Sequence, residues 1–510
     1  MVCPVPTNRL PPLVRRAQEY PARTAVADGL GTCTYGEVSA WSAAVARDLL
    51  EDRADLDEAR VALLASPGAA YVAGQWGTWM AGGVSVPLSP QQTALEWEYI
   101  LDDSRATEAI VTSEHAAAFV PLAAARGLRI ITVETGPRAQ RPASGAAPPV
   151  PDIGLERRAL MLYTSGTTSR PKGVVLTHGN LAAQVECLTE AWAWMPADRA
   201  LHVLPLNHTH GVINVLACAL WNGAVCEFAG GFDAAQAWRR LASGEISVFM
   251  AVPTIYGRLI AAWRDAPPDV QADWSRGAAG LRIFVSGSAA LPAPVFGEWR
   301  AITGHSLLER YGMTEIGMAL SNPLHGDRRP GVVGMPLPGV DVRLVDDDGR
   351  DVDIGRPGEI LVRGPGVFRE YWGRPDATAA AFADGGWFRT GDVAAREGGV
   401  FRILGRLSID IIKTGGEKVS ALEVEAVLRQ HPDIADCAVV GLPDEEWGEC
   451  VAAVVALRDG ASLSLPDLRD WARARISGPK LPRRLATVSA LPRNAMGKVV
   501  KAQLIQLFEA

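Results

Sequence analysis

Residues Tyr163-Thr-Ser-Gly-Thr-Thr-Ser-Arg-Pro-Lys-Gly173 form the stretch that decides how this chain is interpreted. The stretch directly follows an apolar run, Ala159-Leu-Met-Leu-Tyr163, which predicts a β-strand. Its Ser and Thr hydroxyls, two glycines and Lys172 can aim hydrogen-bond donors and one ammonium at a polyphosphate, while glycine permits close approach. The GxxxxGK[ST] spacing of a Walker loop is absent. We therefore interpret the stretch as a phosphate-binding loop of another kind, with a polar surface turn as the alternative.

The chain is long enough for more than one domain, because single hydrophobic cores stop growing near roughly 250–300 residues. Its 510 residues are 48% hydrophobic and 21% charged, which is typical of a globular protein. Before the loop, short apolar runs at 60–64 and 128–133 alternate with helical patterns, and the Pro-, Ala- and Gly-rich residues 136–151 predict a surface connection. We expect a large N-terminal layered α/β domain over residues 1–405.

After about residue 405 the pattern changes to a shorter α+β type. Ser420 and Glu423 predict a capping box for one helix, and a second helix is expected to begin near Ser464. Apolar runs at 438–441 and 451–456 predict strands. We expect a small, mobile α+β C-terminal domain over residues 406–510.

The charge balance excludes some classes of partner. Fifty basic against 57 acidic residues give a net charge of −7, which provides no general attraction to nucleic acid or to an anionic membrane. The first residues lack the apolar run of an export signal, and no stretch is apolar over the roughly 18 residues that span a bilayer. Seven cysteines lie scattered without close pairing, which favours neither a disulfide framework nor a zinc site. We expect a cytoplasmic protein with no nucleic-acid or membrane partner.

Five further motifs follow the loop along the chain. They are Ser286-Gly-Ser-Ala289, Arg310-Tyr-Gly-Met-Thr-Glu315, Trp387-Phe-Arg-Thr-Gly-Asp392, Gly405-Arg406 and Leu491-Pro-Arg-Asn-Ala-Met-Gly-Lys498. Together with the loop, and in this order, they resemble the superfamily of acyl-CoA synthetases, nonribosomal-peptide adenylation domains and luciferases over most of the chain. The resemblance implies an AMP-forming enzyme that uses MgATP to convert a carboxylic acid to an acyl-adenylate and then passes the acyl group to a thiol.

The resemblance implies a role at each matching position. Glu315 would bind Mg²⁺, a hard cation that prefers carboxylate and phosphate oxygens. Asp392 would accept hydrogen bonds from the ribose hydroxyls, with Arg406 supporting the ribose and phosphate. The other implied ATP contacts are Thr164, Ser165, Gly166, Thr167, Thr168, Lys172, Gly287, Ser288, Ala289, Tyr311, Gly312 and Thr314. Taken singly, Asp392 could equally cap a turn and Arg406 could be an ordinary surface charge.

A catalytic lysine near the end of the chain is also implied by the resemblance. Lys498 would lie near the α-phosphate, where a cation offsets charge as the acyl-adenylate forms. Lys172, Thr314 and Glu315 complete the implied catalytic set. The small domain would rotate between adenylation and thioester formation about a hinge at Ser408, since a hinge needs only tolerant backbone torsions.

Arg310 narrows the choice of acid. Several stretches, among them Leu204-Pro-Leu-Asn-His-Thr-His-Gly211 and Ala251-Val-Pro-Thr-Ile-Tyr-Gly-Arg258, resemble malonyl-CoA synthetases. A guanidinium at 310 can bind the far carboxylate of a short diacid through two charge-assisted hydrogen bonds, each worth about 1.5–3 kcal/mol. A fatty-acid pocket would leave that charge unpaired and desolvated. An ion pair between Arg310 and Glu309 or another acid is the alternative.

Three weaker acyl contacts are expected beside Arg310, namely Arg258, His208 and Met313. Arg258 could instead project to solvent from a helix. His208 and His210 flank Thr209 at a spacing that could suit a metal, but no cysteine or carboxylate cluster accompanies them. Pocket lining is therefore the preferred interpretation of the two histidines.

The predicted reaction joins a small acid, malonate or methylmalonate, to CoA at the expense of ATP, with Mg²⁺ as the metal. One alternative is an adenylating enzyme that passes its acyl group, or another small oxyacid, to an acyl carrier protein or an amine. A second is a catalytically idle nucleotide-binding protein. The presence of Lys172, Glu315, Asp392 and Lys498 argues against the second alternative.

Overall fold

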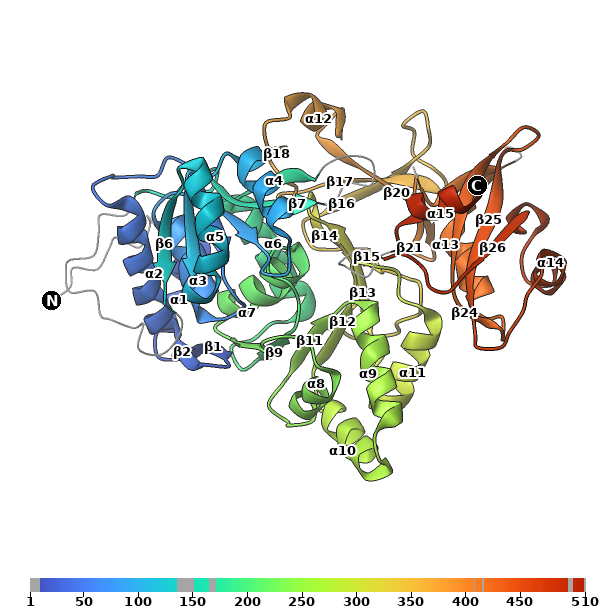
Figure 1. The fold of residues 1–510 in the computed structure, drawn as a ribbon, viewed down its shortest axis with the longest axis horizontal. Helices are drawn as coiled ribbons and strands as arrows, with labels where there is room; N and C mark the ends of the chain where they lie inside the picture. The colour runs from blue at the N-terminus through green and yellow to red at the C-terminus, as the bar shows by residue number, and fades with distance from the viewer. Residues whose placement is uncertain are drawn as a thin grey trace.

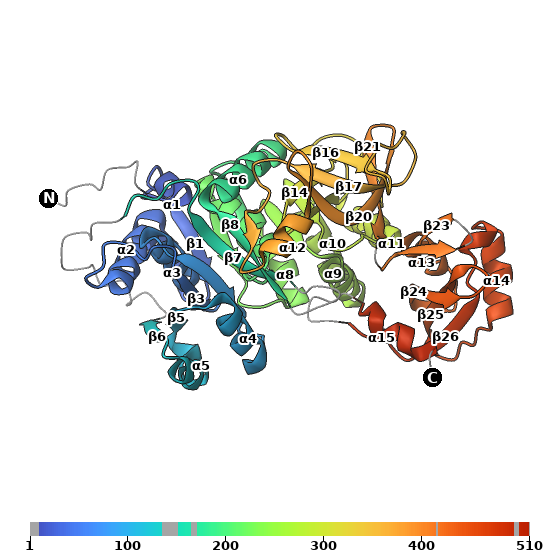
Figure 2. The same ribbon diagram turned by 90° about the horizontal axis from the view of Figure 1, so that it is seen from above.

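The structure is a computed structural model that describes residues 10–134, 151–164, 171–407, 409–414, 417–493 and 499–508. A seven-stranded and a nine-stranded sheet are followed along the chain by two five-stranded sheets. Figures 1 and 2 show the C-terminal sheet at the end of the molecule opposite helix α2. The connection predicted at 136–151 lies almost entirely outside the described residues.

The seven-stranded sheet is parallel from β7 to the β6 edge, and β8 and β18 extend it with antiparallel pairing. In spatial order its strands are β18 (Glu370–Tyr371), β8 (Lys172–Thr177), β7 (Arg158–Thr164), β4 (Val84–Leu88), β3 (Arg60–Leu64), β5 (Glu108–Thr112) and β6 (Arg129–Val133). The strands predicted at 60–64, 128–133 and 159–163 are therefore confirmed. Because side chains alternate across a strand, Val61 and Leu63 enter the largest core while Ala62 and Leu64 enter a second core on the other face.

The nine-stranded sheet supplies the edge at which the predicted site residues gather. Its strands, in order, are β15 (Met335–Pro336), β14 (Gly317–Ser321), β13 (Leu308–Met313), β12 (Ile283–Ser286), β11 (Val248–Ala251), β9 (Arg199–His202), β10 (Val225–Phe228), β1 (Thr24–Asp28) and β2 (Gly31–Thr34). Neighbouring strands from β1 through β10, β9, β11 and β12 to β13 pair in parallel. Their carboxyl ends therefore lie at one edge of the sheet.

Helices join these two sheets and cover their outer faces. Between the sheets, α3 (Ala69–Met80) contacts β3, β4 and β1, and α6 (His178–Trp192) contacts β7, β8 and β14. The remaining helices of this part are α1 (Pro12–Ala17), α2 (Tyr35–Leu50), α4 (Ala94–Ser104), α5 (Ser113–Arg126), η3 (His210–Ala217), α7 (Cys218–Trp221), α8 (Ala234–Leu241), α9 (Pro253–Asp265), α10 (Pro268–Ala278), α11 (Ala293–Thr303) and α12 (Pro375–Ala380). The layered α/β architecture that was expected is confirmed.

A third sheet carries two further predicted site residues. It consists of β16 (Asp341–Val345), β17 (Gly358–Arg363), β20 (Trp387–Glu397) and β19 (Phe382–Ala383), with β21 (Val400–Arg406) paired to β20. The antiparallel register of β20 and β21 places Asp392 directly opposite Arg406.

The C-terminal part is a separate α+β unit, as expected. Its sheet holds β22 (Ile411–Thr414), β23 (Glu417–Ser420), β24 (Ile434–Asp444), β25 (Gly448–Leu457) and β26 (Arg484–Val488). Its helices are α13 (Ala421–Leu428), α14 (Leu465–Arg473), η4 (Gly478–Lys480), α15 (Lys501–Ile505) and η5 (Gln506–Phe508). Ser420 caps α13 by accepting from the Glu423 backbone N–H, but the Glu423 carboxylate contacts Lys480 and Arg402, so half of the predicted capping box forms.

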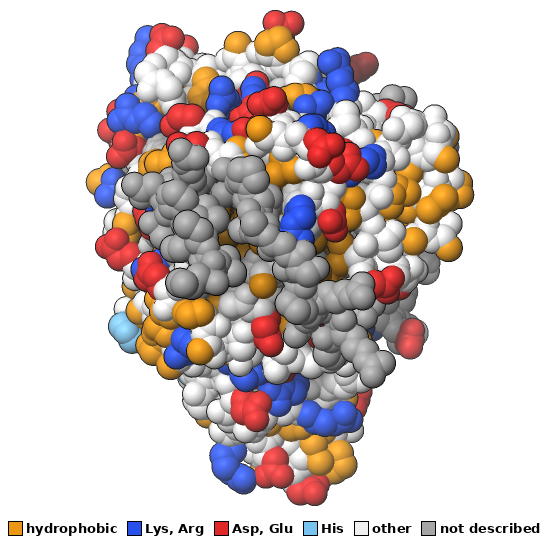
Figure 3. All heavy atoms as spheres, turned by 90° about the vertical axis from the view of Figure 1, so that its left-hand side faces the viewer, with side chains coloured by type: hydrophobic (Ala, Val, Ile, Leu, Met, Phe, Trp, Pro, Cys, Tyr) orange, Lys and Arg blue, Asp and Glu red, His pale blue; other side chains and the backbone are white. Residues whose placement is uncertain are grey.

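No described helix has the length and apolar composition needed to cross a membrane. On the face drawn in Figure 3, basic and acidic side chains are interspersed. That face therefore offers no broad area of one charge.

Close packing between α2 and α3 yields a prediction about stability. A Cβ at Gly77 in α3 would lie 2.7 Å from the Val45 Cβ in α2 and 2.9 Å from the Ser42 carbonyl oxygen. Gly77→Ala should lower the free energy of unfolding by about 1–3 kcal/mol, because the two helices must separate. The helical Gly257 has nothing within 4 Å of its ideal Cβ, so Gly257→Ala should raise it by up to about 1 kcal/mol. Thermal melting of both variants measures the two stability changes. Equal melting temperatures would contradict the packing argument.

Candidate active site

The candidate site lies at the carboxyl ends of the parallel strands β9, β11, β12 and β13. Open α/β sheets bind ligands at such an edge, because the loops that follow the strands converge there. Gly287 follows β12, while Arg310 and Tyr311 are neighbours on β13 and therefore point to opposite faces of the strand. One short strand thus places candidate site residues on both of its faces.

Arg310 is a buried cation without a counter-ion among the described residues. Its exposed fraction is 3%, and its Nε and Nη2 atoms have no hydrogen-bond partner in the described part of the chain. A Cβ at Gly287 would lie 2.5 Å from the Arg310 Cζ, so glycine at this position makes room for the guanidinium. Burial lowers the pKa of Arg310 to about 9. The environment therefore disfavours the charge unless an anion enters.

The alternative ion pair with Glu309 does not form. Glu309 lies on the other face of β13, where its Oε1 accepts from the Leu291 backbone N–H at 3.2 Å. Burial raises the pKa of Glu309 to about 7. The salt bridges of the described residues include none to Arg310, so its guanidinium remains available to a ligand.

The side chains beside Arg310 are polar, and only some of their hydrogen-bonding groups have a described partner. The π-helix η3 begins at His210, and such π-helical turns recur at functional sites. The His210 Nδ1 lies 3.2 Å from the Ser288 Oγ, while its Nε2 has no partner among the described residues. Burial first, and then the Arg310 charge, lower the pKa of His210, which keeps the ring neutral. Ser288 has φ +68°, a strained conformation for a non-glycine residue.

Further buried polar atoms near His210 in the chain have no described partner. They belong to Asn207, Thr209 and Asn214, and a further such atom belongs to Ser286 at the end of β12. Since buried polar groups in proteins are nearly always hydrogen-bonded, such a concentration points to a polar ligand or ordered water. Asn214 belongs to none of the motifs, whereas Ser286 begins the Ser286-Gly-Ser-Ala289 motif without an implied role of its own.

Asp392 joins three strands into one hydrogen-bonded cluster, whose residues are the predicted nucleotide contacts. Its Oδ2 accepts from the Tyr311 hydroxyl at 2.7 Å, and its Oδ1 accepts from the Arg406 Nε at 2.9 Å. Burial lowers the pKa of Arg406, but the charge and hydrogen bond of Asp392, together with nearby Tyr311 and Glu315, outweigh burial and raise the pKa. The structure thus brings together three residues that the motifs selected separately, and their contact with ribose stays a prediction.

Glu315 is a nearly buried carboxylate in the turn between β13 and β14. Its exposed fraction is 5%, and the Tyr371 hydroxyl donates to its Oε1 at 2.9 Å. Burial raises the pKa of Glu315. The described residues contain no group of three or more metal-ligating side chains. Mg²⁺ is commonly bound by one or two carboxylates plus substrate phosphates, so Glu315 fits a metal that is held jointly with ATP.

Lys172 is linked to Glu315 through an aromatic side chain that the sequence did not single out. Lys172 begins β8 opposite Thr164 at the end of β7. Its Nζ lies 4.9 Å from the centroid of the Tyr371 ring. Tyr371 therefore contacts both the loop lysine and the candidate metal ligand. It belongs to none of the recognised motifs, and the two-residue strand that holds it, β18, is too short to produce a periodic signal.

Comparison with known proteins assigns the family. A model described as AMP-binding enzyme matches residues 13–372, and one described as AMP-binding enzyme C-terminal domain matches residues 423–498. The chain belongs to the AMP-binding enzyme family. The resemblance drawn from the six ordered motifs is therefore confirmed.

The similarity to individual members of the AMP-binding enzyme family covers nearly the whole chain. A mitochondrial malonate–CoA ligase of Mus musculus is 45% identical, over 97% of this chain and 90% of its own length. The crystal structure of ATP-bound MatB from Rhodopseudomonas palustris has a TM-score of 0.88 at 34% identity and covers 99% of both chains. A malonyl-CoA ligase in a ternary product complex with methylmalonyl-CoA and AMP has a TM-score of 0.68 at 36% identity, covering 93% of this chain and 97% of that one.

Not every predicted residue of this family member joins the cluster. Arg258 is exposed on α9 and lies over the Phe232 ring, with 4.9 Å between its Cζ and the ring centroid, so the structure gives it no described contact with Arg310. Met313 and Thr314 are half-buried where β13 ends, and His208 is half-buried before η3. The predicted residues Ser165, Gly166, Thr167, Thr168, Ser408 and Lys498 lie outside the described residues.

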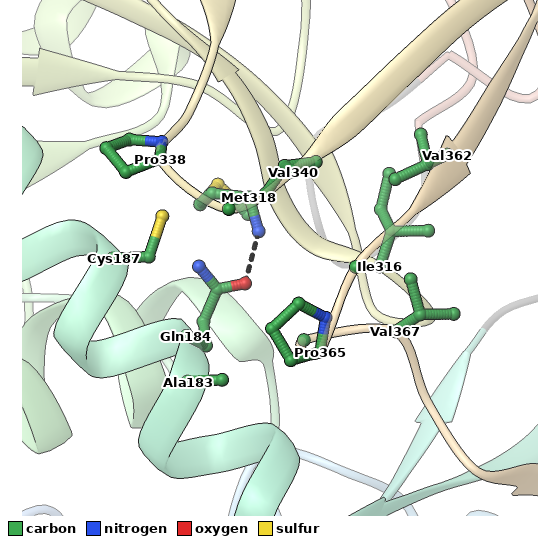
Figure 4. Close-up of a pocket in the computed structure, with 13 residues that line it drawn as sticks. Ala183, Gln184, Cys187, Ile316, Met318, Pro338, Val340, Val362, Pro365 and Val367 are labelled. Carbon is green, nitrogen blue, oxygen red and sulfur yellow. Dashed lines mark hydrogen bonds between the residues drawn. The ribbon is translucent and has the colours of Figure 1, made fainter.

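A small apolar hollow behind β14 shows how Glu315 is held in place. It is lined by residues of α6, β14 and β17 and by the loops at 338–340 and 364–367 (Figure 4). Gln184 of α6 accepts from the Met318 backbone N–H at 2.6 Å. A Cβ at Gly317, whose φ is +62°, would lie 1.5 Å from the Gln184 Oε1. Glycine is thus required at the end of the turn that carries Glu315.

The Asp392 cluster predicts that nucleotide affinity depends on this carboxylate. Asp392→Asn should weaken ATP binding by about tenfold to a hundredfold, because the neutral amide loses charge-assisted hydrogen bonds to Arg406 and to the nucleotide. Titration calorimetry with ATP in the absence of acid and CoA measures the effect. Asp341→Asn is a matched control, since Asp341 forms an exposed pair with Arg363 in the same sheet. An unchanged affinity in Asp392→Asn would remove Asp392 from the nucleotide site.

Proposed function

We propose that this member of the AMP-binding enzyme family is a malonate–CoA ligase, converting malonate, ATP and CoA to malonyl-CoA, AMP and pyrophosphate. The observation that carries the proposal is the buried, unpaired guanidinium of Arg310 beside unsatisfied polar groups. A dicarboxylate supplies the missing anion, whereas an uncharged acyl chain leaves the guanidinium desolvated at a cost of several kcal/mol. Two similar proteins are named malonate–CoA ligase and malonyl-CoA ligase, which supports malonate as the acid.

In the first step one malonate oxygen attacks the α-phosphorus, and the bond to pyrophosphate breaks with its electrons. The nucleophile belongs to the substrate, so the side chains contribute positioning and charge. Arg310 holds the distal carboxylate, and the Asp392–Tyr311–Arg406 cluster orients the nucleotide. Lys172 would contact the phosphates. Glu315 would hold Mg²⁺, which would offset phosphate charge when bound. Lys498 is proposed to lie against the α-phosphate during this step.

In the second step the sulfur of CoA attacks the acyl carbon, AMP leaves and the thiol proton passes to solvent. We propose that the unit 406–510 rotates about Ser408 between the two steps. The separation of the hydrophobic cores supports this boundary, because the largest core ends at Phe401 and the C-terminal cores begin at Ile412. A short cluster containing Val393 and Ile411 bridges the junction.

The proposal also covers the acyl acceptor, the identity of the acid and the cellular location of the enzyme. The relatives are named as CoA ligases, which favours CoA over an acyl carrier protein or an amine as acceptor. Methylmalonate is a second substrate of the same class, and it is the acyl group of the product in one similar structure. The cytoplasmic location expected from the sequence belongs to this proposal too, although the mouse relative is named as mitochondrial.

An acid panel tests the proposed function at Arg310. Pyrophosphate release and CoA-dependent AMP formation should be strong with malonate in the unsubstituted enzyme. Arg310→Met should lower kcat/KM for malonate by about a hundredfold or more, because two charge-assisted hydrogen bonds are lost. Arg310→Lys should be intermediate, since lysine lacks the planar two-donor fork. Butyrate, which has no distal carboxylate, should lose much less.

Arg264→Met is the matched control for that panel. Arg264 lies near the end of α9, where it is exposed and pairs with Glu298 at the surface. Its loss should leave the preference for malonate unchanged. Proportional losses of malonate and butyrate activity in Arg310→Met would assign Arg310 to structure or nucleotide binding and remove the main support for a diacid. Acyl transfer only to a carrier protein or an amine would overturn the CoA acceptor.

Lys498→Ala should separate the two half-reactions. Its charge is proposed to act at the phosphate only in the first step, so acyl-adenylate formation should fall by about two orders of magnitude or more. Thiolysis of a supplied malonyl-adenylate by CoA should stay within a few-fold of the unsubstituted rate. Pyrophosphate exchange and thioester formation measure the two steps separately. Equal losses in both steps would contradict this division and the proposed rotation.

A further inference from the structure

Tyr371 occupies a position between two predicted phosphate-site groups that lie far apart in the sequence. Its hydroxyl donates to the Glu315 Oε1 at 2.9 Å, and its ring lies 4.9 Å from the Lys172 Nζ. The residue is only 8% exposed. A single buried side chain therefore offers a hydrogen bond to the carboxylate and an aromatic face to the ammonium.

The backbone on either side of Tyr371 is hydrogen-bonded to Glu315 and to the residue after Lys172. The Phe368 N–H donates to the Glu315 carbonyl oxygen at 2.7 Å, and the Trp372 N–H donates to the Gly173 carbonyl oxygen at 2.8 Å. Tyr371 itself pairs with Val174 of β8. Residues 368–372 thus connect the β13–β14 turn of the nine-stranded sheet to β8 of the seven-stranded sheet.

We propose that Tyr371 is a positioning residue, which fixes the Glu315 carboxylate and the Lys172 ammonium relative to each other so that both meet one metal–polyphosphate group. The inference rests on the proposed function only in requiring an ATP site at Glu315 and Lys172. The hydroxyl removes rotational freedom from the carboxylate before the metal arrives. The ring holds the ammonium over its face.

A purely structural role for Tyr371 makes a different prediction. The ring packs against Phe368, with 4.7 Å between ring centroids, in a cluster that also includes Phe382 and Phe388. Phenylalanine would fill that space equally well. Removing the hydroxyl alone therefore separates positioning from packing.

The first experiment tests the hydroxyl without any catalysis. Mn²⁺ binding to the full chain saturated with α,β-methylene-ATP is followed by the electron paramagnetic resonance signal of free Mn²⁺, with no acid and no CoA present. Tyr371→Phe should weaken Mn²⁺ binding by about tenfold, because a hydrogen bond to a charged ligand group is lost. Tyr35→Phe is the control: Tyr35 is also fully buried and donates its hydroxyl to the Ala224 carbonyl oxygen, outside the site. The control should bind Mn²⁺ like the unsubstituted protein.

The second experiment tests the ring. With EDTA present, the affinity for α,β-methylene-ATP should be the same in Tyr371→Phe as in the unsubstituted chain, because the aromatic face is kept. Tyr371→Leu should bind about two- to fivefold more weakly, since Lys172 loses its aromatic support. Thermal melting accompanies each variant. If Tyr371→Leu does not fold, the Mn²⁺ result with the conservative phenylalanine variant still decides the proposal.

Unchanged Mn²⁺ affinity in Tyr371→Phe overturns the proposal, as does an equal loss in Tyr35→Phe. A fall in melting temperature with unchanged Mn²⁺ binding would assign Tyr371 to packing alone. The proposed function fails by a different observation, namely absent malonate-dependent pyrophosphate release in the unsubstituted enzyme. Because the binding assays contain neither malonate nor CoA, the two failures are distinguishable.

Discussion

The pleat of β13 is the constraint on which the rest of the site depends. Successive residues of a strand face opposite ways, so Arg310 lies against Gly287 on one face while Tyr311, on the other face, donates to Asp392. The chemistry proposed for this protein requires a carboxylate and an α-phosphate within bonding reach of each other. Adjacent residues of one strand can hold the two substrates side by side, because they project from its two faces. The turn after the strand then supplies Glu315.

The unsatisfied polar groups around Arg310 are costly for the fold, and under the proposed function they select the ligand. A guanidinium with two unpartnered nitrogens, a neutral buried histidine and a strained Ser288 all lower stability. The surrounding cores, rich in apolar side chains on both sheets, can tolerate that loss. The same unsatisfied groups disfavour an acyl chain that leaves them unpaired, because specificity arises from the penalty against the wrong ligand as well as from contacts to the right one.

Glu315 shows how the large sheets cooperate around one carboxylate. Gln184, on a helix between the sheets, holds the start of β14, while residues 368–372 tie the preceding turn to β8. The candidate metal ligand is therefore held by backbone and side-chain contacts from three separate segments. Residues that touch no substrate in the proposed reaction thus set the geometry of those that do.

The sequence by itself determined the family and the layered architecture, because these depend on local order and periodicity, and it supplied the candidate site residues as predictions. The strands at 60–64 and 159–163, the helix capped by Ser420 and the two-part organisation all followed from patterns within short windows. Only the tertiary structure decided that Arg310 has no ion pair with Glu309, that Arg258 lies over Phe232, and that Tyr371 joins Glu315 to Lys172. Each of these facts concerns which side chains meet across elements distant in sequence. Burial and the absence of a counter-ion are properties of that assembled space, which no local spacing of residues encodes.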